Sequence, residues 1–333
     1  MIKMLRKLFV ILLLALLLVP IGCSKDEVVD ITRYRTVVIR VPADTYLGQR
    51  TPGDPGVVST LQIPRYLYFF TAFTPLNSTT GNKGPQISAL RLDQITPDSW
   101  ISVSDATGTI ISYERTIQLP LPDADEVMLY AVASYDPLTD METLVDQVRS
   151  GTVTLDESTV ASLQLSSVQA DGSSVSIADV YAGNGRLLTD ENAVNEPLVC
   201  YHVAAKFDVI YNLSDDFRSG GAFAAWRVKT FTLKNQIGKG FYFNPAANSY
   251  VAQEALPDYT FTATPGNNFY GRFDLYLFQP IVMEFPWTVT LTDGTAERTL
   301  SGTSTATDVS TGYAAYFRLN LTINGIGSDT GNE

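Results

Sequence analysis

Short strand-like segments separated by turn residues make up most of this sequence, and they limit the folds that it can adopt. Residues 34–43, 66–73 and 126–133 are apolar and rich in Val, Tyr and Phe, the residue types that favour strands. Similar segments recur in the second half, where residues 198–211 are predicted to form one long strand and Asp293-Gly294 marks a hairpin. Helices do not alternate with the strands as a parallel sheet requires. The sequence therefore predicts an all-β chain of two tandem antiparallel β-sandwich domains, with one or two short helices.

One helix is predicted between the strands of the first half. It would begin at Thr139, whose side chain would cap it while Glu142 reaches back, as in a capping box. Its end is expected near Ser150 and Gly151. The apolar face of this helix would consist of Met141, Leu144, Val145 and Val148.

The first 23 residues have the pattern of a lipoprotein signal peptide. Three basic residues precede the apolar run 8–19, which is shorter than the roughly 20 residues that span a bilayer. The segment ends in Gly22 and Cys23, the order at which bacterial lipoproteins are cleaved. The thiol of Cys23 would take a diacylglyceryl group, and its freed amine a further acyl chain such as palmitate. Several acyl chains together make a firm membrane anchor.

The net charge and the cysteine content limit which partners the chain can bind and which disulfides it can form. The formal net charge is −12, and no basic patch interrupts the acidic surface. Such a surface repels nucleic acid, so no nucleic-acid partner is expected. One cysteine, Cys200, remains after Cys23, which excludes an intrachain disulfide in the lipidated chain. Cys200 lies in an apolar strand pattern and is predicted to be a buried free thiol.

The sequence gives little support to catalysis or metal binding. His202 is the one histidine, and a strand-face position explains it better than a dyad with Cys200. A single His and a free Cys leave a zinc site short of ligands. Asp136, Asp140 and Glu142 miss the calcium-loop spacing. A carboxylate pair for glycoside cleavage stays open, because the two residues can be distant in sequence. We expect no enzyme activity, no cofactor and no metal.

Two strands near the ends of the chain stand out. In the first, Val37, Ile39 and Val41 share one face, and the strand is followed by the polar loop 45–56. This loop contains prolines, glycines and Arg50, which predicts exposure to proteases. In the last strand, four apolar residues alternate strictly with polar ones. It is either an edge strand of the second sandwich or a strand given to another molecule. The four apolar residues are Phe317, Leu319, Leu321 and Ile323.

Together these features resemble the fimbrillins of Bacteroidales, the type V pilins, over essentially the whole chain. Residues 201–209 resemble the strand that opens the second domain in that family, and residues 24–27 resemble a surface-export tag. The layout is most similar to accessory subunits of the short (minor) fimbriae, near the tip. The resemblance implies transthyretin-like, Greek-key sandwiches. The expected segments are a signal peptide (1–22), a propeptide (23–50), an N-terminal sandwich (51–197) and a C-terminal sandwich (198–333).

The resemblance also implies how such a chain is processed. The lipid would hold the precursor at the outer membrane until an arginine-specific protease cuts between Arg50 and Thr51. Arg40 and Arg35 fit less well, because they lie within the strand pattern. Cutting would free the strand with Val37, Ile39 and Val41. A donor strand from another fimbrial subunit would then fill its place, and in this family the donor is the C-terminal strand.

The function implied is that of a structural or accessory fimbrial subunit at the cell surface, contributing to adhesion and biofilm formation. Host or bacterial surface ligands are then expected partners. The subunit could lie at the tip or in the shaft of the fimbria. The alternative is a surface glycan-binding lipoprotein of a nutrient-uptake system. Such a protein would keep Cys23 and use exposed aromatics, for which residues 241–243 and 269–270 are candidates.

Overall fold

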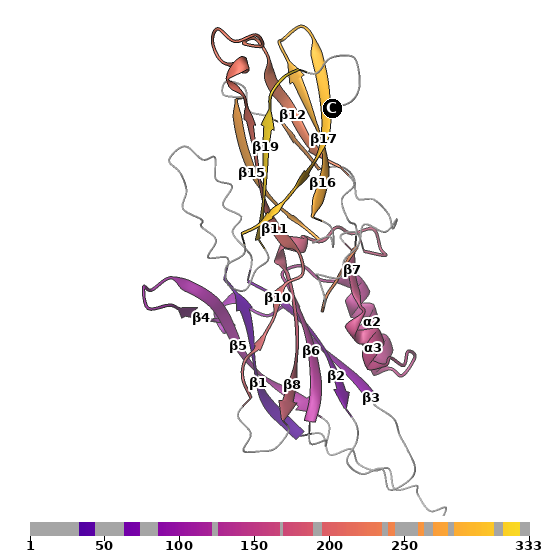
Figure 1. Ribbon diagram of the computed structural model, residues 1–333. Helices are drawn as coiled ribbons and strands as arrows, with labels where there is room; N and C mark the ends of the chain where they lie inside the picture. The colour runs from indigo at the N-terminus through magenta and orange to yellow at the C-terminus, as the bar shows by residue number, and fades with distance from the viewer. Residues whose placement is uncertain are drawn as a thin grey trace, which may run out of the picture.

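The computed structural model shows an all-β chain, as predicted. It describes residues 33–43, 63–73, 86–121, 126–166, 169–188, 195–234, 239–243, 259–262, 269–278, 283–309 and 316–326. Cys23, Arg50 and Thr51, on which the processing predictions rest, lie outside the described residues. Two β-sandwiches lie end to end, with the N-terminal one in indigo to magenta and the C-terminal one in orange to yellow (Figure 1).

The N-terminal sandwich consists of a four-stranded and a five-stranded sheet. The four-stranded sheet has the order β4-β5-β1-β9. Its strands are β1 (Arg33–Pro42), β4 (Ile101–Ser104), β5 (Ile110–Leu121) and β9 (Leu198–Val199). The five-stranded sheet, β10-β8-β6-β2-β3, is antiparallel throughout. Its strands are β2 (Tyr66–Phe73), β3 (Gln86–Leu92), β6 (Glu126–Ser134), β8 (Val180–Leu188) and β10 (Tyr201–His202).

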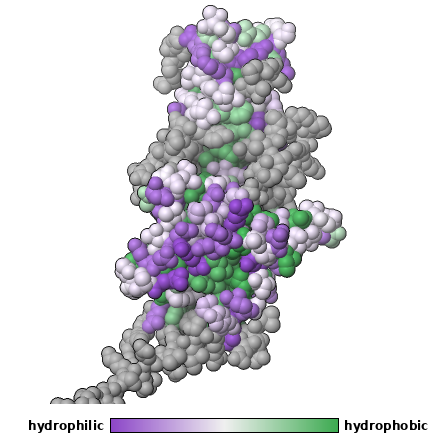
Figure 2. All heavy atoms as spheres, turned by 180° about the vertical axis from the view of Figure 1, so that it is seen from behind, coloured by the Kyte–Doolittle hydropathy of each residue, from purple (hydrophilic) through white to green (hydrophobic). Residues whose placement is uncertain are grey.

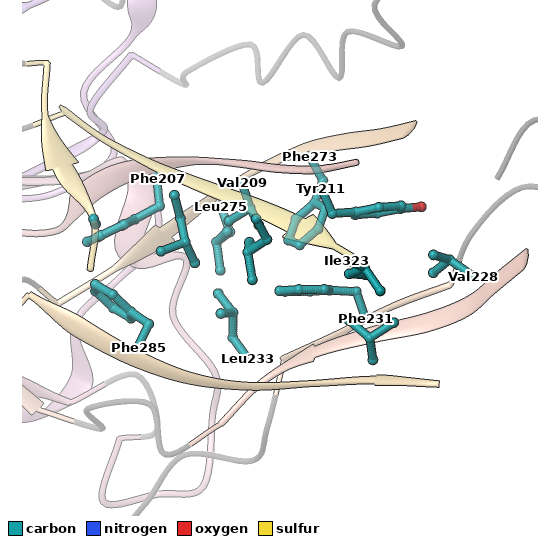
Figure 3. Packing of buried hydrophobic residues seen from close by; sticks show 14 of the residues in the cluster. Phe207, Val209, Tyr211, Val228, Phe231, Leu233, Phe273, Leu275, Phe285 and Ile323 are labelled. Carbon is teal, nitrogen blue, oxygen red and sulfur yellow. The ribbon is translucent and has the colours of Figure 1, made fainter. Parts of the chain in front are cut away.

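The C-terminal sandwich pairs two four-stranded sheets. One has the order β15-β11-β19-β18, with β11 (Ala205–Leu213), β15 (Tyr270–Leu277), β18 (Thr307–Asp308) and β19 (Tyr316–Ile323). The other has the order β14-β12-β16-β17, with β12 (Arg227–Leu233), β14 (Tyr259–Thr262), β16 (Glu284–Thr292) and β17 (Glu297–Thr305). Aromatic and aliphatic side chains from the two sheets interdigitate between them (Figure 3).

The helical segments lie mainly in the N-terminal half and follow the sequence prediction in part. Those of the N-terminal half are the α-helices α2 (Thr139–Arg149) and α3 (Glu157–Ala161) and the short 3-10 turns η1 (Pro97–Ser99) and η2 (Ile177–Asp179), whereas the turn η3 (Asp215–Phe217) belongs to the C-terminal sandwich. Met141 and Val145 of α2 are buried, as its apolar face predicted. The helix is followed by Ser150 and then by Gly151, whose φ of 71° ends it where expected.

The predicted capping box at the start of α2 is wrong. The cap position is Leu138 rather than Thr139, and no side chain of the cap itself accepts a hydrogen bond. Instead, the backbone N–H of Leu138 donates to the hydroxyl of Tyr68 in β2 at 3.0 Å. The side chain of Gln169 accepts from the next free amide, that of Asp140, at 3.2 Å. Other elements therefore satisfy the amides that a local cap would have satisfied.

The junction between the sandwiches also differs from the prediction. Residues 198–211 form three strands instead of one, because the chain changes sheets twice. β9 pairs with β1 in one N-terminal sheet, β10 pairs with β8 in the other, and β11 opens the C-terminal sandwich at Ala205. Gly183 permits the first change, since a Cβ there would clash with the backbone carbonyl of Val199. Residues 198–202 therefore pair with the N-terminal sheets, beyond the boundary predicted after residue 197.

The contacts between the two sandwiches include a small sheet and an aromatic cluster. β7 (Gln164–Ser166) pairs with β13 (Lys239–Phe241), which brings a segment of each half of the chain into one small sheet. The ring of His202 lies 4.4 Å from that of Tyr181 and 5.9 Å from that of Tyr276, between centroids. Tyr181 belongs to β8 and Tyr276 to β15, so this cluster of tilted rings bridges the two domains.

A buried carboxylate ties three strands of the C-terminal sandwich together. Asp208 of β11 is fully buried and accepts hydrogen bonds from Arg272 Nε of β15 at 2.6 Å and from Arg318 Nε of β19 at 2.9 Å. The hydroxyl of Tyr316 donates to Oδ2 of Asp208, the oxygen that also accepts from Arg318, at 3.2 Å. Removing one member of such a group leaves the remaining charges without a partner.

We expect Asp208→Ala to lower the free energy of unfolding by about 3 kcal/mol, because two arginines lose a buried partner. Urea unfolding followed by tryptophan fluorescence measures this. The matched control is Asp215→Ala, which removes a carboxylate from an ion pair with Arg218 while its side chain is 96% exposed. The control is expected to leave the midpoint unchanged. Equal effects of the two substitutions would contradict the structural role of Asp208.

Candidate functional site

The candidate site is the position of β1 in the N-terminal sandwich, called here the β1 site. β1 pairs antiparallel with β5 along its whole length, from Arg33 opposite Leu121 to Pro42 opposite Ser112. Its other edge pairs in parallel with β9, and the backbone N–H of Cys200 donates to the carbonyl of Arg40 at 2.8 Å. The first described strand of the chain is therefore an inner strand of a sheet whose partners lie far away in sequence.

The inner face of β1 belongs to the core. Val37, Ile39 and Val41 are 2%, 0% and 1% exposed and pack in a cluster with side chains of β2, β5 and β6. These three residues share one face, as their alternation predicted. The structure shows that these side chains lie in the core. The displacement of the strand stays a prediction.

Polar contacts hold the outer face of β1 to β5. Arg40 Nε donates to Glu114 Oε1 at 2.6 Å, and the pair is about a quarter exposed on both sides. Gln118 Nε2 donates to the hydroxyl of Thr36 at 2.6 Å. Partly exposed contacts of this kind contribute modestly, so burial of the inner face dominates the retention of β1.

Arg115 interrupts the apolar inner face beside β1. It lies on β5 directly opposite Ile39, on the same face as Ile117 and Leu119. Its Nε and Nη1 atoms are buried and have no hydrogen-bond partner among the residues that the structure describes. Burial lowers the pKa of its guanidinium. Sequence reasoning missed this residue, although its place in the alternation from Tyr113 to Leu121 would have shown that it faces inward.

The predicted donor strand lies in its own sandwich. β19 pairs in parallel with β11, from Tyr316 opposite Lys206 to Ile323 opposite Leu213, and on its other side with the two-residue strand β18. Its alternate residues are 0–4% exposed and fill the core seen in Figure 3. These are Phe317, Leu319, Leu321 and Ile323. Donation of β19 to a neighbour stays a prediction, and it would require these side chains to leave this core.

The structure gives no support to a Cys200–His202 dyad. Cys200 is fully buried, its Sγ lies 3.9 Å from the carbonyl of Ala131, and burial raises its pKa to about 12. Nδ1 of His202 lies 3.1 Å from a different carbonyl, that of Ala178. A neutral, inaccessible thiol is a poor nucleophile. Across the described ranges, no three His, Cys, Asp or Glu side chains are grouped to hold a metal ion.

The aromatic clusters considered for sugar binding are used largely in packing. Tyr242 is 4% exposed, and Phe243 packs edge-on against Tyr130 with centroids 5.0 Å apart. The guanidinium of Arg227 lies 4.0 Å above the ring of Phe269, while Tyr270 remains 37% exposed. Apolar and polar residues interleave on the surface drawn in Figure 2. No helix within the described part of the chain has the length and apolarity to cross a membrane.

Known proteins are similar to this chain in structure rather than in sequence. No protein-family model matches the chain, and no curated protein matches it. In structure, the chain is similar to a fimbrial assembly protein of Parabacteroides distasonis, with 11% identity and a TM-score of 0.46 over 88% of this chain and 92% of that chain. It is also similar to a protein of Bacteroides eggerthii assigned to cell adhesion, with 13% identity and a TM-score of 0.49 over 88% and 87%. The structural neighbours are thus fimbrial assembly and cell-adhesion proteins of Bacteroidales.

The contribution of the inner face of β1 can be measured with a matched pair of substitutions. Val37→Ala removes two methyl groups from a fully packed position, and we expect it to lower the unfolding free energy by about 2 kcal/mol. Val38→Ala makes the same change on the outer face and is expected to lower it by about 0.5 kcal/mol or less. Urea unfolding of both variants provides the comparison, and similar losses would contradict the placement of β1.

The burial of Cys200 predicts slow thiol chemistry in the folded protein. The experiment uses a form of the protein that begins at Ser24. Iodoacetamide at pH 8 is expected to label Cys200 far more slowly in buffer than in about 8 M urea, which denatures the protein. The reason is that the folded thiol is neutral and inaccessible. Mass spectrometry over time measures the rates. Comparable labelling in the two conditions would contradict the burial.

Proposed function

We propose that this chain is an accessory fimbrial subunit that is exported as a lipoprotein precursor and matured by cleavage between Arg50 and Thr51. It would be incorporated when a strand of a neighbouring subunit replaces β1, and it would contribute to adhesion and biofilm formation at the cell surface. The position of β1 carries this proposal. A strand at the start of the chain completes a buried core and precedes the segment that contains Arg50.

Loss of β1 would create a site that attracts another strand. Its three core side chains contribute roughly 1.5–3 kcal/mol each on burial, so about 5–9 kcal/mol of gross burial is forfeited when β1 leaves. The edges of β5 and β9 would lose their backbone partners as well. Exposed apolar surface beside an unpaired sheet edge is prone to association until it is covered. Strand addition restores both contributions at once, and an occupied β1 site blocks it.

The arginines around the proposed cleavage site support the choice of Arg50. Arg35 and Arg40 lie within β1. The backbone of Arg35 is paired with β5, and that of Arg40 is paired with both β5 and β9. On the other side, the backbone N–H of Arg65 donates to the carbonyl of Ser134 at 2.8 Å, and its guanidinium lies 4.4 Å above the ring of Tyr135. A protease needs an extended, unpaired segment. Arg50 is the arginine between these two ordered strands.

An accepting role alone is sufficient for a subunit at the end of a fimbria. A donated β19 would break the contact between Arg318 and the buried Asp208, and it would remove four side chains from the C-terminal core. The contacts of β19 therefore favour a terminal or accessory position, in which the subunit receives a strand and keeps its own last strand.

Arg50→Ala tests the maturation step. In cells that make the fimbriae, this variant is expected to stay at precursor length and to be absent from sheared fimbriae, because β1 still fills its site. Immunoblotting of whole cells and of sheared fimbriae measures both effects. Normal incorporation of an uncut variant would refute the proposal.

A second substitution serves as the control. Adding Gln49→Arg to the Arg50→Ala variant restores an arginine at the neighbouring position and is expected to restore cleavage and incorporation. N-terminal sequencing of the wild-type protein separates the two candidate functions. A start at Thr51 agrees with assembly, whereas a blocked, lipidated start at Cys23 agrees with a glycan-binding lipoprotein.

A further inference from the structure

The inner face of the β1 site has one charged position among apolar ones. Along the β1–β5 ladder, Val37 faces Ile117 and Val41 faces Tyr113, but Ile39 faces Arg115. Directly opposite residues of an antiparallel pair share a face with Cβ atoms about 5 Å apart. The aliphatic side chain of Ile39 therefore lies beside a guanidinium to which it can offer no hydrogen bond.

The neighbouring groups do not relieve Arg115. Its Nε and Nη1 atoms are buried without a hydrogen-bond partner among the described residues. The adjacent carboxylate, that of Glu114, points to the opposite face of the sheet and bonds to Arg40. A buried donor without an acceptor is unfavourable, and more so when it carries a charge. β1 thus fits the apolar part of its site at Val37 and Val41 and leaves two guanidinium nitrogens of Arg115 without an acceptor.

We propose that the strand that replaces β1 carries an Asp or Glu at the position facing Arg115. This inference rests on the proposed function and specifies the chemistry of the partner strand. A carboxylate there pairs with the guanidinium through charge-assisted hydrogen bonds, which are stronger than neutral ones. The position in the sheet is the same whether the new strand runs parallel or antiparallel to β5. The preference for a carboxylate gives the exchange its direction, since the new strand makes a contact that β1 lacks.

The same chemistry identifies a second copy of this chain as a poor partner. Its last strand, residues 316–323, contains no Asp or Glu in any register. Inserted into the β1 site, it would leave Arg115 as unsatisfied as β1 does. The matching strand therefore belongs to a different subunit, and this chain does not polymerise with itself through the β1 site.

The test uses the chain from Ser24 onward, cut after Arg50 by an arginine-specific protease that is then inhibited. Fluorescent peptides of residues 33–42 compete with the native segment, with Ile39 kept, Ile39→Gln or Ile39→Glu. Anisotropy is expected to show that the Ile39→Glu peptide binds more tightly than the unchanged peptide and about 10- to 100-fold more tightly than the Ile39→Gln peptide. Arg115→Met should abolish this difference. The matched control is a Val37→Glu peptide, whose carboxylate would face Ile117 and which is expected to bind more weakly than the unchanged peptide.

The outcomes separate this inference from the proposed function. If peptides enter the site but the Ile39→Glu and Ile39→Gln peptides bind equally, or if their difference persists in Arg115→Met, strand acceptance stands and the carboxylate preference is overturned. If no peptide enters the cut protein, both fail. A preference for Ile39→Glu that depends on Arg115, together with no enrichment for a peptide of residues 316–323 over the unchanged one, supports the inference.

Discussion

The burial of one strand, β1, between β5 and β9 holds the N-terminal sandwich together. Val37, Ile39 and Val41 reach the centre of a core to which strands from both sheets contribute. Its partners lie far apart in the sequence, and β9 belongs to the junction with the C-terminal sandwich. A change in β1 therefore affects both the core of the N-terminal sandwich and the junction with the C-terminal sandwich. A group that binds the folded state stabilises it by mass action, and after cleavage β1 would become such a ligand.

The two sandwiches use related arrangements in opposite ways. Each contains one parallel pair, β1 with β9 and β11 with β19, in otherwise antiparallel sheets. The β1–β9 pairing covers two residue pairs, whereas β19 follows β11 along its whole length. The polar contact between β1 and β5, Arg40 with Glu114, is partly exposed, but Arg318 of β19 bonds to the fully buried Asp208. β1 is thus held mainly by apolar burial, and β19 is also held by an ion pair between a partly exposed arginine and a buried carboxylate.

The sequence predicted the features that local patterns encode and missed those that depend on distant pairing. Alternation placed the inner face of β1 and the apolar face of β19 correctly, because side-chain direction follows directly from strand geometry. The two parallel pairings depend on strands far apart in sequence, and no local signal specifies them. Residues 198–211 were predicted as one strand because their apolar character continues while the chain crosses between sheets. The capping box at Thr139 failed because the hydroxyl of Tyr68, 70 residues earlier, accepts the amide of Leu138. The lack of an acceptor for Arg115 depends on which residue lies opposite it, and that pairing comes from the structure rather than from a local pattern.

Shifting β1 along its site cannot satisfy Arg115. A slip by one residue would turn the apolar face outward, so only shifts by two preserve burial. Such shifts place Val37 or Val41 opposite Arg115, and a shift by four places Arg35 there. Residues 33–42 contain three arginines and no acidic residue, so every allowed register presents an apolar or a like-charged side chain. The mismatch is thus a property of the whole strand rather than of one residue. A strand can combine the apolar alternation of β1 with a carboxylate only if it comes from a different sequence, and this difference would give the proposed exchange its direction.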